Sequence, residues 1–269
     1  MPGATDPIYR ASRRALLDVL DALGDHRAAV VLVGAHAVYL HTGDADVALA
    51  EFTKDADVAL DPRILSDEPL IETAMMRGGF NRPGQPGIWL NSEAAQVDLL
   101  VPEDLAGIGG TRSVTLPPHD RHAIRRVRGL EGARVDNAEH DLQALDPNDH
   151  RETRIRVAGP AALIVSKAHK LYERHRGRRH VAPKDAHDVY RLLVATETET
   201  LARTIRLLRA DSLAGPSTRE ALEYLFELFA TPEAVGSRLA GQAEAEIGEP
   251  DTVAVATSAL IGALLSASE

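Results

Sequence analysis

The sequence predicts an α+β protein in which a mixed sheet comes first and a bundle of helices follows. Short apolar or alternating runs, which are typical of strands, lie before residue 158. Gly159-Pro160 interrupts that pattern. From Ala161 onward, apolar residues recur at the three-to-four-residue spacing of helices. We therefore expect two domains, with the sheet in residues 1–158 and the helices in residues 159–269.

The elements follow one another in a simple order. In the first domain we expect a helix at Ile8–Leu23, a strand at Ala28–Val33, a helix at Ala35–Leu40, a strand at Phe52–Leu60, a helix at Ile71–Arg77, paired strands at Ile88–Leu90 and Gln96–Val101, and further strands at His122–Val127 and Arg154–Val157. In the second domain we expect helices at Ala161–Arg176, Lys184–Ala195, Thr198–Ala210, Thr218–Phe229, Pro232–Glu246 and Thr252–Leu265.

Composition excludes several classes of protein. The 269 residues, 44% of them hydrophobic, suffice for one sizeable core or two modest ones. The absence of cysteine excludes disulfides, thiolate metal sites and cysteine nucleophiles. The N-terminal segment lacks the basic and apolar regions of a signal peptide, and no uninterrupted apolar stretch reaches the roughly 18 residues that span a bilayer. We expect a soluble cytoplasmic protein with no membrane partner.

An acidic strand carries the first functional signal. Asp55 and Asp57 are two positions apart in Thr53-Lys54-Asp55-Ala56-Asp57, so on a strand both side chains leave the same face. Two carboxylates at such a short distance repel each other unless a cation lies between them, and Mg²⁺ prefers such oxygen ligands. The spacing therefore predicts a magnesium site, although surface strands also carry alternating acids.

Two neighbouring features strengthen that interpretation. Gly34 ends an apolar strand and starts a helix, and the free N–H groups of such a turn suit a triphosphate, although a glycine is also used for a tight turn alone. Asp98 lies inside the apolar strand Gln96–Val101, where a buried carboxylate needs a partner. A metal shared with Asp55 and Asp57 is a sufficient partner, and three such carboxylates can hold two Mg²⁺ ions. In that scheme Asp98 would ligate the second ion and take the proton of the acceptor.

In this order, the Gly34 turn, the Asp-x-Asp strand and the later lone Asp98 resemble the DNA polymerase β-type nucleotidyltransferase superfamily. Helical motifs further on, around Lys167, Arg174 and 184–190, resemble the AbiEii branch, which includes the MenT toxins. The resemblance covers about residues 30 to 195. It implies a polymerase β-like sheet and a nucleotidyltransferase that moves NMP from an NTP to an acceptor. In the toxin branch that acceptor is, for some members, the 3′ end of tRNA, and a cognate antitoxin accompanies the enzyme.

The resemblance also implies roles for individual residues. Asp55, Asp57 and Asp98 would bind Mg²⁺ or Mn²⁺, and Lys167 with Asp185 would match the essential lysine and acid of the family, in a helical domain that contributes to the cleft. An ammonium group near the triphosphate offsets its charge, but Lys167 could equally pair with Asp185 or Asp188 across two helices. Nucleotide binding would fall to Gly34, Ala35, Thr53, Lys54 and Lys167.

The chain departs from the family pattern at two points. Ala35 stands where a small hydroxyl residue is usual, so only its backbone N–H is left to bind phosphate. The 19 residues between Ala35 and Asp55 form a longer spacer than usual, and Gly43-Asp44-Ala45-Asp46 within it indicates an extra loop. Because glycine precedes Asp44 and Asp46 and no strand pattern surrounds them, we interpret this second acidic pair as a solvated turn.

Charge suggests the acceptor. The net charge is −10, yet residues 151–191 contain eleven Lys or Arg against four Asp or Glu. Within this region, we expect phosphate contacts with RNA from Arg174, Arg176, Arg178 and Arg179, although the same run also suits a solvated loop. The eleven histidines show no ligand spacing, so we expect them to be solvated or to face phosphate. Trp89 is expected to pack in the core.

The sequence leaves three functions open. The first is a Mg²⁺-dependent nucleotidyltransferase acting on RNA as the toxin of a toxin–antitoxin pair. The second is nucleotidylation of a protein or a small molecule. The third is a catalytically silent nucleotide-binding module, which would not need three clustered acids.

Overall fold

The computed structural model describes residues 6–43, 53–108, 112–246 and 248–269. The chain divides into two compact units. Unit 1 comprises Met1–Ala37, Phe52–Leu130 and Asn137–Ala158, and unit 2 comprises Val38–Glu51, Glu131–Asp136 and Gly159–Glu269. The short segments 38–51 and 131–136 thus group with the helical unit, although both precede residue 159 in the chain.

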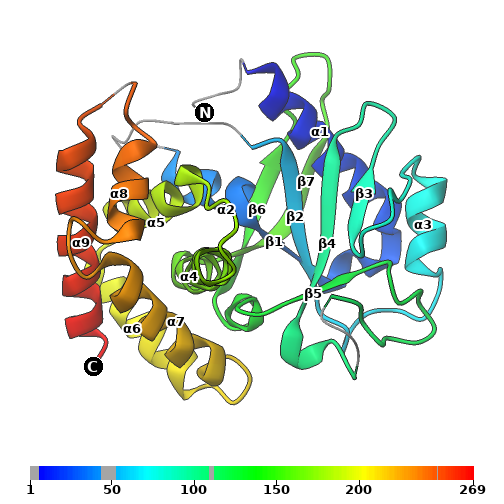
Figure 1. Cartoon of the computed structure of the whole chain (residues 1–269). Coiled ribbons are helices and arrows are strands. Elements are labelled where there is room, and N and C mark those ends of the chain that lie inside the picture. The colour runs from blue at the N-terminus through cyan, green and yellow to red at the C-terminus, as the bar shows by residue number, and fades with distance from the viewer. Residues whose placement is uncertain (1–5, 44–52, 109–111, 247) are drawn as a thin grey trace. The chain divides into compact units, whose positions relative to one another are not determined.

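Unit 1 is built on a mixed sheet. Its strands in the described residues are β1 (Val30–Val33), β2 (Asp55–Leu60), β3 (Ile88–Leu90), β4 (Gln96–Pro102), β5 (Arg125–Val127), β6 (Asn137–Gln143) and β7 (Glu152–Ala158). They lie in the order β3-β4-β2-β1-β7-β6, and β5 pairs with the end of β4 (Figure 1). The β1–β7, β2–β4 and β4–β5 pairs are parallel, and the others are antiparallel. The expected α+β class with a mixed sheet is confirmed.

Helices α1 (Pro7–Leu23), α2 (Gly34–Thr42) and α3 (Ile71–Arg77) accompany this sheet, with short 3-10 turns at Gly24–Ala29 and Glu103–Leu105. The Asp6 carboxylate accepts a hydrogen bond from the Tyr9 amide and caps α1. Leu16, Val19 and Leu20 of α1 are fully buried, because this helix packs against β2, β4 and α3. The apolar periodicity of α1 therefore supplies the cover for the strands that carry the acids.

Unit 2 is helical. A 3-10 turn at Glu131–Arg134 precedes its helices α4 (Pro160–Arg176), α5 (Pro183–Ala195), α6 (Thr198–Ala210), α7 (Gly215–Phe229), α8 (Val235–Gln242) and α9 (Pro250–Ala267). Helix α4 packs against α5, α6 and α7, and α9 packs against α6, α7 and α8. The Asp136 carboxylate accepts a hydrogen bond from the Ala162 amide at 2.9 Å and caps α4. A Cβ on Gly159 would lie 2.0 Å from Asp136 Oδ1, so only glycine fits there.

Several boundaries differ from the sequence prediction. The strand expected from Ala28 begins at Val30, because 24–29 form a 3-10 turn, and the one expected from Phe52 begins at Asp55, with Phe52 outside the described residues. The strand expected from His122 begins at Arg125. Helix α8 covers only Val235–Gln242 of the range expected from Pro232 to Glu246. Strand β6 was not predicted. The Asp44–Asp46 turn lies outside the described residues.

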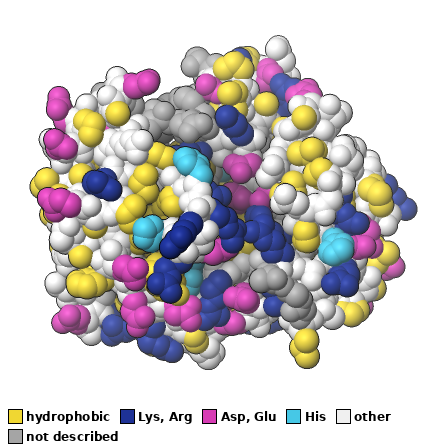
Figure 2. All heavy atoms as spheres, viewed as in Figure 1, with side chains coloured by type: hydrophobic (Ala, Val, Ile, Leu, Met, Phe, Trp, Pro, Cys, Tyr) yellow, Lys and Arg dark blue, Asp and Glu magenta, His cyan; other side chains and the backbone are white. Residues whose placement is uncertain are grey.

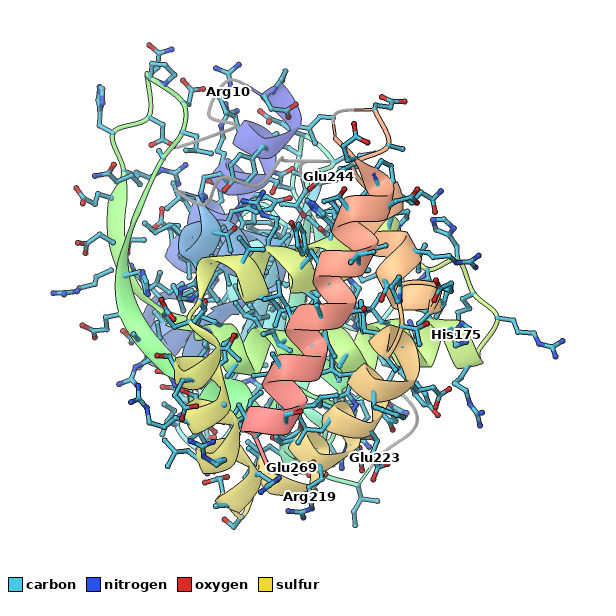
Figure 3. The ribbon with its side chains drawn as sticks, turned by 90° about the vertical axis from the view of Figure 1, so that its left-hand side faces the viewer. Arg10, His175, Arg219, Glu223, Glu244 and Glu269 are labelled. Carbon is cyan, nitrogen blue, oxygen red and sulfur yellow. The ribbon has the colours of Figure 1, made fainter. Side chains whose placement is uncertain are left out.

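Helix α9 is unusually apolar for a helix with so much exposed surface. Figure 3 shows it in front, with Glu269 just beyond its C-terminal end. Its buried side is Val253, Ala254, Thr257, Ile261 and Leu264, while Val255 on another side is 54% exposed. Of the helices in the described residues, it alone has the length and apolar composition to cross a membrane, and 28% of its residues are buried. Length and composition of one helix are weak evidence for a span.

Candidate functional site

The three acids singled out in the sequence come together on neighbouring strands. Asp57 of β2 is the direct register partner of Asp98 of β4 in a parallel pair, and Asp55 is opposite Gln96. Residues paired in this way project from the same face of the sheet, and so do Asp55 and Asp57, two positions apart. Ala56 and Val58 between and beyond them are fully buried. The register therefore gathers three carboxylates on one face of unit 1.

Gly34 lies directly against this group. It has φ +66°, a backbone conformation that side chains rarely adopt, at the point where β1 ends and α2 begins. A Cβ at Gly34 would lie 2.1 Å from Asp57 Oδ2, so the absence of a side chain is what makes room for that carboxylate. The expected turn between strand and helix is thus adjacent to the second aspartate of the acidic strand.

The residues next to Gly34 and Asp55 differ in their exposure. Ala35 is 6% exposed. Thr53 is 1% exposed, and its hydroxyl donates to Asp55 Oδ1 at 2.7 Å, so it orients the carboxylate. Lys54 is exposed. The predicted nucleotide contacts of these residues stay predictions.

Asp98 already has partners. Arg125 Nη2 donates to its Oδ2 at 2.6 Å, and Gln96 Nε2 donates to its Oδ1 at 2.8 Å. Asp98 is 4% exposed, so the guanidinium neutralises a carboxylate that burial would otherwise penalise. Gly87, with φ +74°, lets β5 come this close, because a Cβ there would lie 2.6 Å from the backbone nitrogen of Arg125. Sequence reasoning did not find Arg125 as a partner of Asp98.

The donor set fits a divalent cation in part. Asp55 and Asp57 offer hard oxygen ligands on one face, which suit Mg²⁺. Asp98 is engaged by a cation of the protein itself. As the side chains stand, no group of three or more His, Cys, Asp or Glu among the described residues is arranged to hold a metal ion. Asp98 would complete such a group only by exchanging Arg125 for the ion.

In unit 2, Lys167 lies in a buried ionic cluster. Its Nζ donates to Asp185 Oδ1 at 2.8 Å and to Asp188 Oδ2 at 2.6 Å, and Lys170 also contacts Asp185 at 2.9 Å. Burial alone would lower the pKa of Lys167, but the two carboxylates raise it above its ordinary value. Burial alone would raise the pKa of Asp185, but Lys167 and Lys170 hold it well below its ordinary range. The pairing across two helices is therefore present, and a catalytic role stays a prediction.

The basic loop, defined as Arg174–His180, comprises the last residues of α4, which ends at Arg176, and the turn after it. Arg176, Arg178 and Arg179 are exposed, and His175 marks the end of the helix in Figure 3. Arg174 Nη1 reaches Asp185 Oδ2 at 3.5 Å, so it belongs partly to the ionic cluster. Figure 2 shows that the face in view carries acidic as well as basic side chains. Arg179 Nη2 lies 3.2 Å from Glu173 Oε1, and Arg176 lies over the Tyr172 ring, so a phosphate would compete with these contacts.

The expectation that the histidines are solvated or face phosphate is wrong for several of them. The buried ones are His26, His36, His119, His169 and His187. His187 pairs with Glu244 at 2.7 Å, and His169 contacts the Ser217 carbonyl at 2.8 Å. Each ring has at least one hydrogen-bond partner within its own unit, which sequence spacing could not indicate, although His26 Nδ1 has none. Trp89 is 1% exposed and donates to the Ala123 carbonyl, so its predicted core position is confirmed.

A polar chain beneath the acidic strand also escaped sequence reasoning. Ser12 Oγ lies 2.5 Å from His36 Nε2 and 3.3 Å from the Asp55 carbonyl oxygen. Arg13 Nε donates to His36 Nδ1 at 3.4 Å. Ser12, Arg13 and His36 are each 1% exposed. The only signal in the sequence was a histidine two positions after Gly34.

Unit 2 also has a surface groove of about 570 Å³ between α6, α7 and α9. Phe226 and Leu265 supply apolar surface, and Glu223, Glu227 and Glu269 border it. Figure 3 labels Glu223 and Glu269. None of the predicted site residues lines this groove.

Compared with known proteins, the chain matches no family model, no curated protein and no solved structure. The family resemblance therefore enters the function only as a proposal.

Proposed function

We propose that the protein is a Mg²⁺-dependent nucleotidyltransferase of the polymerase β-like type, which transfers NMP from an NTP to an RNA acceptor. The observation that carries this function is the direct pairing of Asp57 with Asp98 on parallel strands, with Gly34 pressed against the Asp57 carboxylate. We favour the tRNA 3′ end as the acceptor. We further propose that the protein acts in the cytoplasm and has a cognate antitoxin as a partner.

Asp55 and Asp57 would hold the magnesium ion. When bound, this ion would stabilise the charge on the phosphates of the NTP. The Thr53 hydroxyl orients the Asp55 carboxylate. The backbone amides at the start of α2 follow Gly34 and favour negative charge. These features lie within unit 1, so the nucleotide site is proposed from residues of that unit.

The acceptor is proposed from charge. Arg176, Arg178 and Arg179 in the basic loop are exposed, and guanidinium groups bind phosphate without reading sequence. Transfer to a protein or a small molecule has no such feature in its favour among the described residues.

One observation favours the rival function, a catalytically silent nucleotide-binding module. Asp98 is paired with Arg125 at 2.6 Å, so a metal ion at this carboxylate would have to compete with the guanidinium. The two functions differ in one outcome. A silent module would bind NTP and transfer nothing.

The test is incubation of the protein with each α-labelled NTP, Mg²⁺ and total RNA or protein extract, followed by a gel that separates the two polymers. We expect label on RNA, and mapping of the label should place it at 3′ ends. Label on protein alone would reject the RNA acceptor, and NTP binding with no label on either polymer would support the silent module.

Asp57→Ala is the matching variant. It should abolish transfer while thermal stability changes little, because Asp57 is partly exposed. Asp104→Ala is the control, since it removes a partly exposed aspartate that pairs with Arg128 and lies outside the acidic group. Transfer that survives in Asp57→Ala would contradict the proposed metal site.

A further inference from the structure

We propose that Arg13, His36 and Ser12 form a directed hydrogen-bond chain that positions the backbone of Asp55. This inference rests on the proposed function for its catalytic consequence, but the chain itself is defined by contacts within unit 1. Its members are positioning residues, because each is only 1% exposed and they act through the Asp55 backbone.

The direction of the chain follows from chemistry. A guanidinium nitrogen can only donate, so His36 Nδ1 must accept from Arg13 Nε at 3.4 Å. The ring is therefore neutral, with its proton on Nε2, and this N–H donates to Ser12 Oγ at 2.5 Å. The Ser12 hydroxyl is then free to donate to the Asp55 carbonyl oxygen at 3.3 Å. Each step fixes the polarity of the next.

Arg13, the first member of this hydrogen-bond chain, is held in one orientation. Arg13 Nη1 donates to the Gln143 carbonyl at 3.0 Å, and Nη2 donates to the Tyr9 hydroxyl at 2.9 Å. The Tyr9 ring stacks on the His36 ring, with centroids 5.0 Å apart. Arg13, Tyr9 and His36 are each 1% exposed. Because a planar guanidinium held at several points cannot turn, the His36 ring has one orientation.

The Ser12 end of the hydrogen-bond chain lies where Asp55 is flanked by β4 but no longer by β1. On β1, the last register pair is Val33 with Asp57, and α2 begins at the next residue. Asp55 is two positions beyond that pair and has no β1 residue opposite it. The Ser12 hydroxyl donates to its carbonyl oxygen at 3.3 Å. The Thr53 oxygen lies 3.1 Å from the same carbonyl oxygen, but its hydroxyl donates to the Asp55 carboxylate at 2.7 Å. Helix α1 thus supplies a contact that the shortened strand does not.

A nucleophilic role for the Ser12–His36 pair does not fit this geometry. Both side chains are 1% exposed, so no substrate reaches the hydroxyl. The other nitrogen of His36 accepts from Arg13, whereas in a catalytic triad that nitrogen donates to a carboxylate. We instead assign the Ser12–His36 hydrogen bond the role of orienting the Ser12 hydroxyl toward the Asp55 carbonyl.

The first test needs neither metal nor activity. In ¹⁵N NMR at pH 7.5, the His36 ring should show the neutral Nε2–H form, assigned by its loss in His36→Gln. In Ser12→Ala, the carbonyl ¹³C resonance of Asp55 should move. A His36 ring protonated at Nδ1, or an Asp55 resonance that does not move in Ser12→Ala, would overturn the inference.

The second test uses Mn²⁺ alone, measured by electron paramagnetic resonance. Ser12→Ala should bind Mn²⁺ about tenfold more weakly than the unaltered protein, which is the usual effect of losing a group behind a metal ligand. His36→Gln retains an N–H donor and should bind more tightly than His36→Ala. Ser217→Ala is the matched control, because it removes a buried hydroxyl from unit 2 that bonds the Ala214 carbonyl.

These readouts separate the two proposals. If the unaltered protein binds no Mn²⁺, the proposed function fails, and the chain is judged by the NMR shifts alone. If the protein binds Mn²⁺ and Ser12→Ala binds it equally well, the positioning role fails while the proposed function stands.

Discussion

Asp57 and Asp98 are register partners on parallel strands, and Asp98 is paired with Arg125 at 2.6 Å. The Arg125 guanidinium thus already supplies a positive charge next to the three acids. A divalent ion and Arg125 would compete for the same carboxylate, and this competition can be measured.

Arg125→Ala should lower the free energy of unfolding by about 3 kcal/mol without metal, because it leaves a buried carboxylate without its cation. Added Mg²⁺ should recover part of that loss, since the ion can take the place of the guanidinium. Urea unfolding with and without Mg²⁺ measures both effects. Arg128→Ala is the control, since its pair with Asp104 is more exposed and should cost less than about 1 kcal/mol. An equal loss in Arg125→Ala with and without Mg²⁺ would contradict metal binding at Asp98.

Gly34→Ala should impair the site more than it impairs folding. The new methyl group would meet Asp57 Oδ2 at 2.1 Å, and the positive φ adds a backbone cost of about 1 kcal/mol. Gly24→Ala is the matched control, because Gly24 also has a positive φ, +51°, but no atom lies within 4 Å of its added Cβ. Unfolding and NTP transfer should both be measured. If the two variants transfer equally well, the contact of Gly34 with Asp57 has no role in the site.

Unit 2 should lose stability in acid through Asp185. Its folded-state pKa lies well below the unfolded value of about 3.9, so the unfolded chain binds more protons. The stability that Asp185 contributes is present above pH 4 to 5 and is lost as the pH falls toward the folded pKa. Asp185→Asn should therefore be less stable at pH 7 by roughly 3 kcal/mol, and its stability should fall less steeply below about pH 4. A slope identical to that of the unaltered protein would count against this ionic cluster.

RNA binding should depend on the basic loop. A double change, Arg178→Gln with Arg179→Gln, should weaken RNA binding and reduce the slope of log affinity against log salt by about one for each phosphate that the loop no longer binds. NTP binding should be unchanged. Arg154→Gln is the control, because Arg154 is an exposed arginine of β7 whose partners are Glu139 and Asp141. An unchanged salt slope in the double variant would move the acceptor surface elsewhere.

The sequence was informative where burial and periodicity agree. Helices α3 and α6 have the predicted limits, and the β3–β4 pair forms as expected. The adjacency of Asp57 and Asp98 followed from an acid placed inside an apolar strand. These features depend on short-range patterns that the residues themselves carry.

Other features depend on distant segments, and the pattern could not indicate them. Strand β6 was missed because Leu142 is its only buried residue, so it shows no apolar alternation. The Arg125–Asp98 pair joins residues that β5 and β4 bring together. The contact of Ser12 with Asp55 depends on how α1 packs. Side-chain partners of this kind are set by the tertiary fold, and no local spacing encodes them.

The polar character that hid β6 has a consequence for solubility. This strand forms one edge of the sheet, where unpaired backbone groups could recruit a strand from another molecule. Glu139 and Asp141 place two negative charges along it, opposite Arg154 of β7. A second copy approaching edge to edge would meet like charges in register. The residues that conceal the strand from periodicity are therefore expected to disfavour edge-to-edge pairing between molecules.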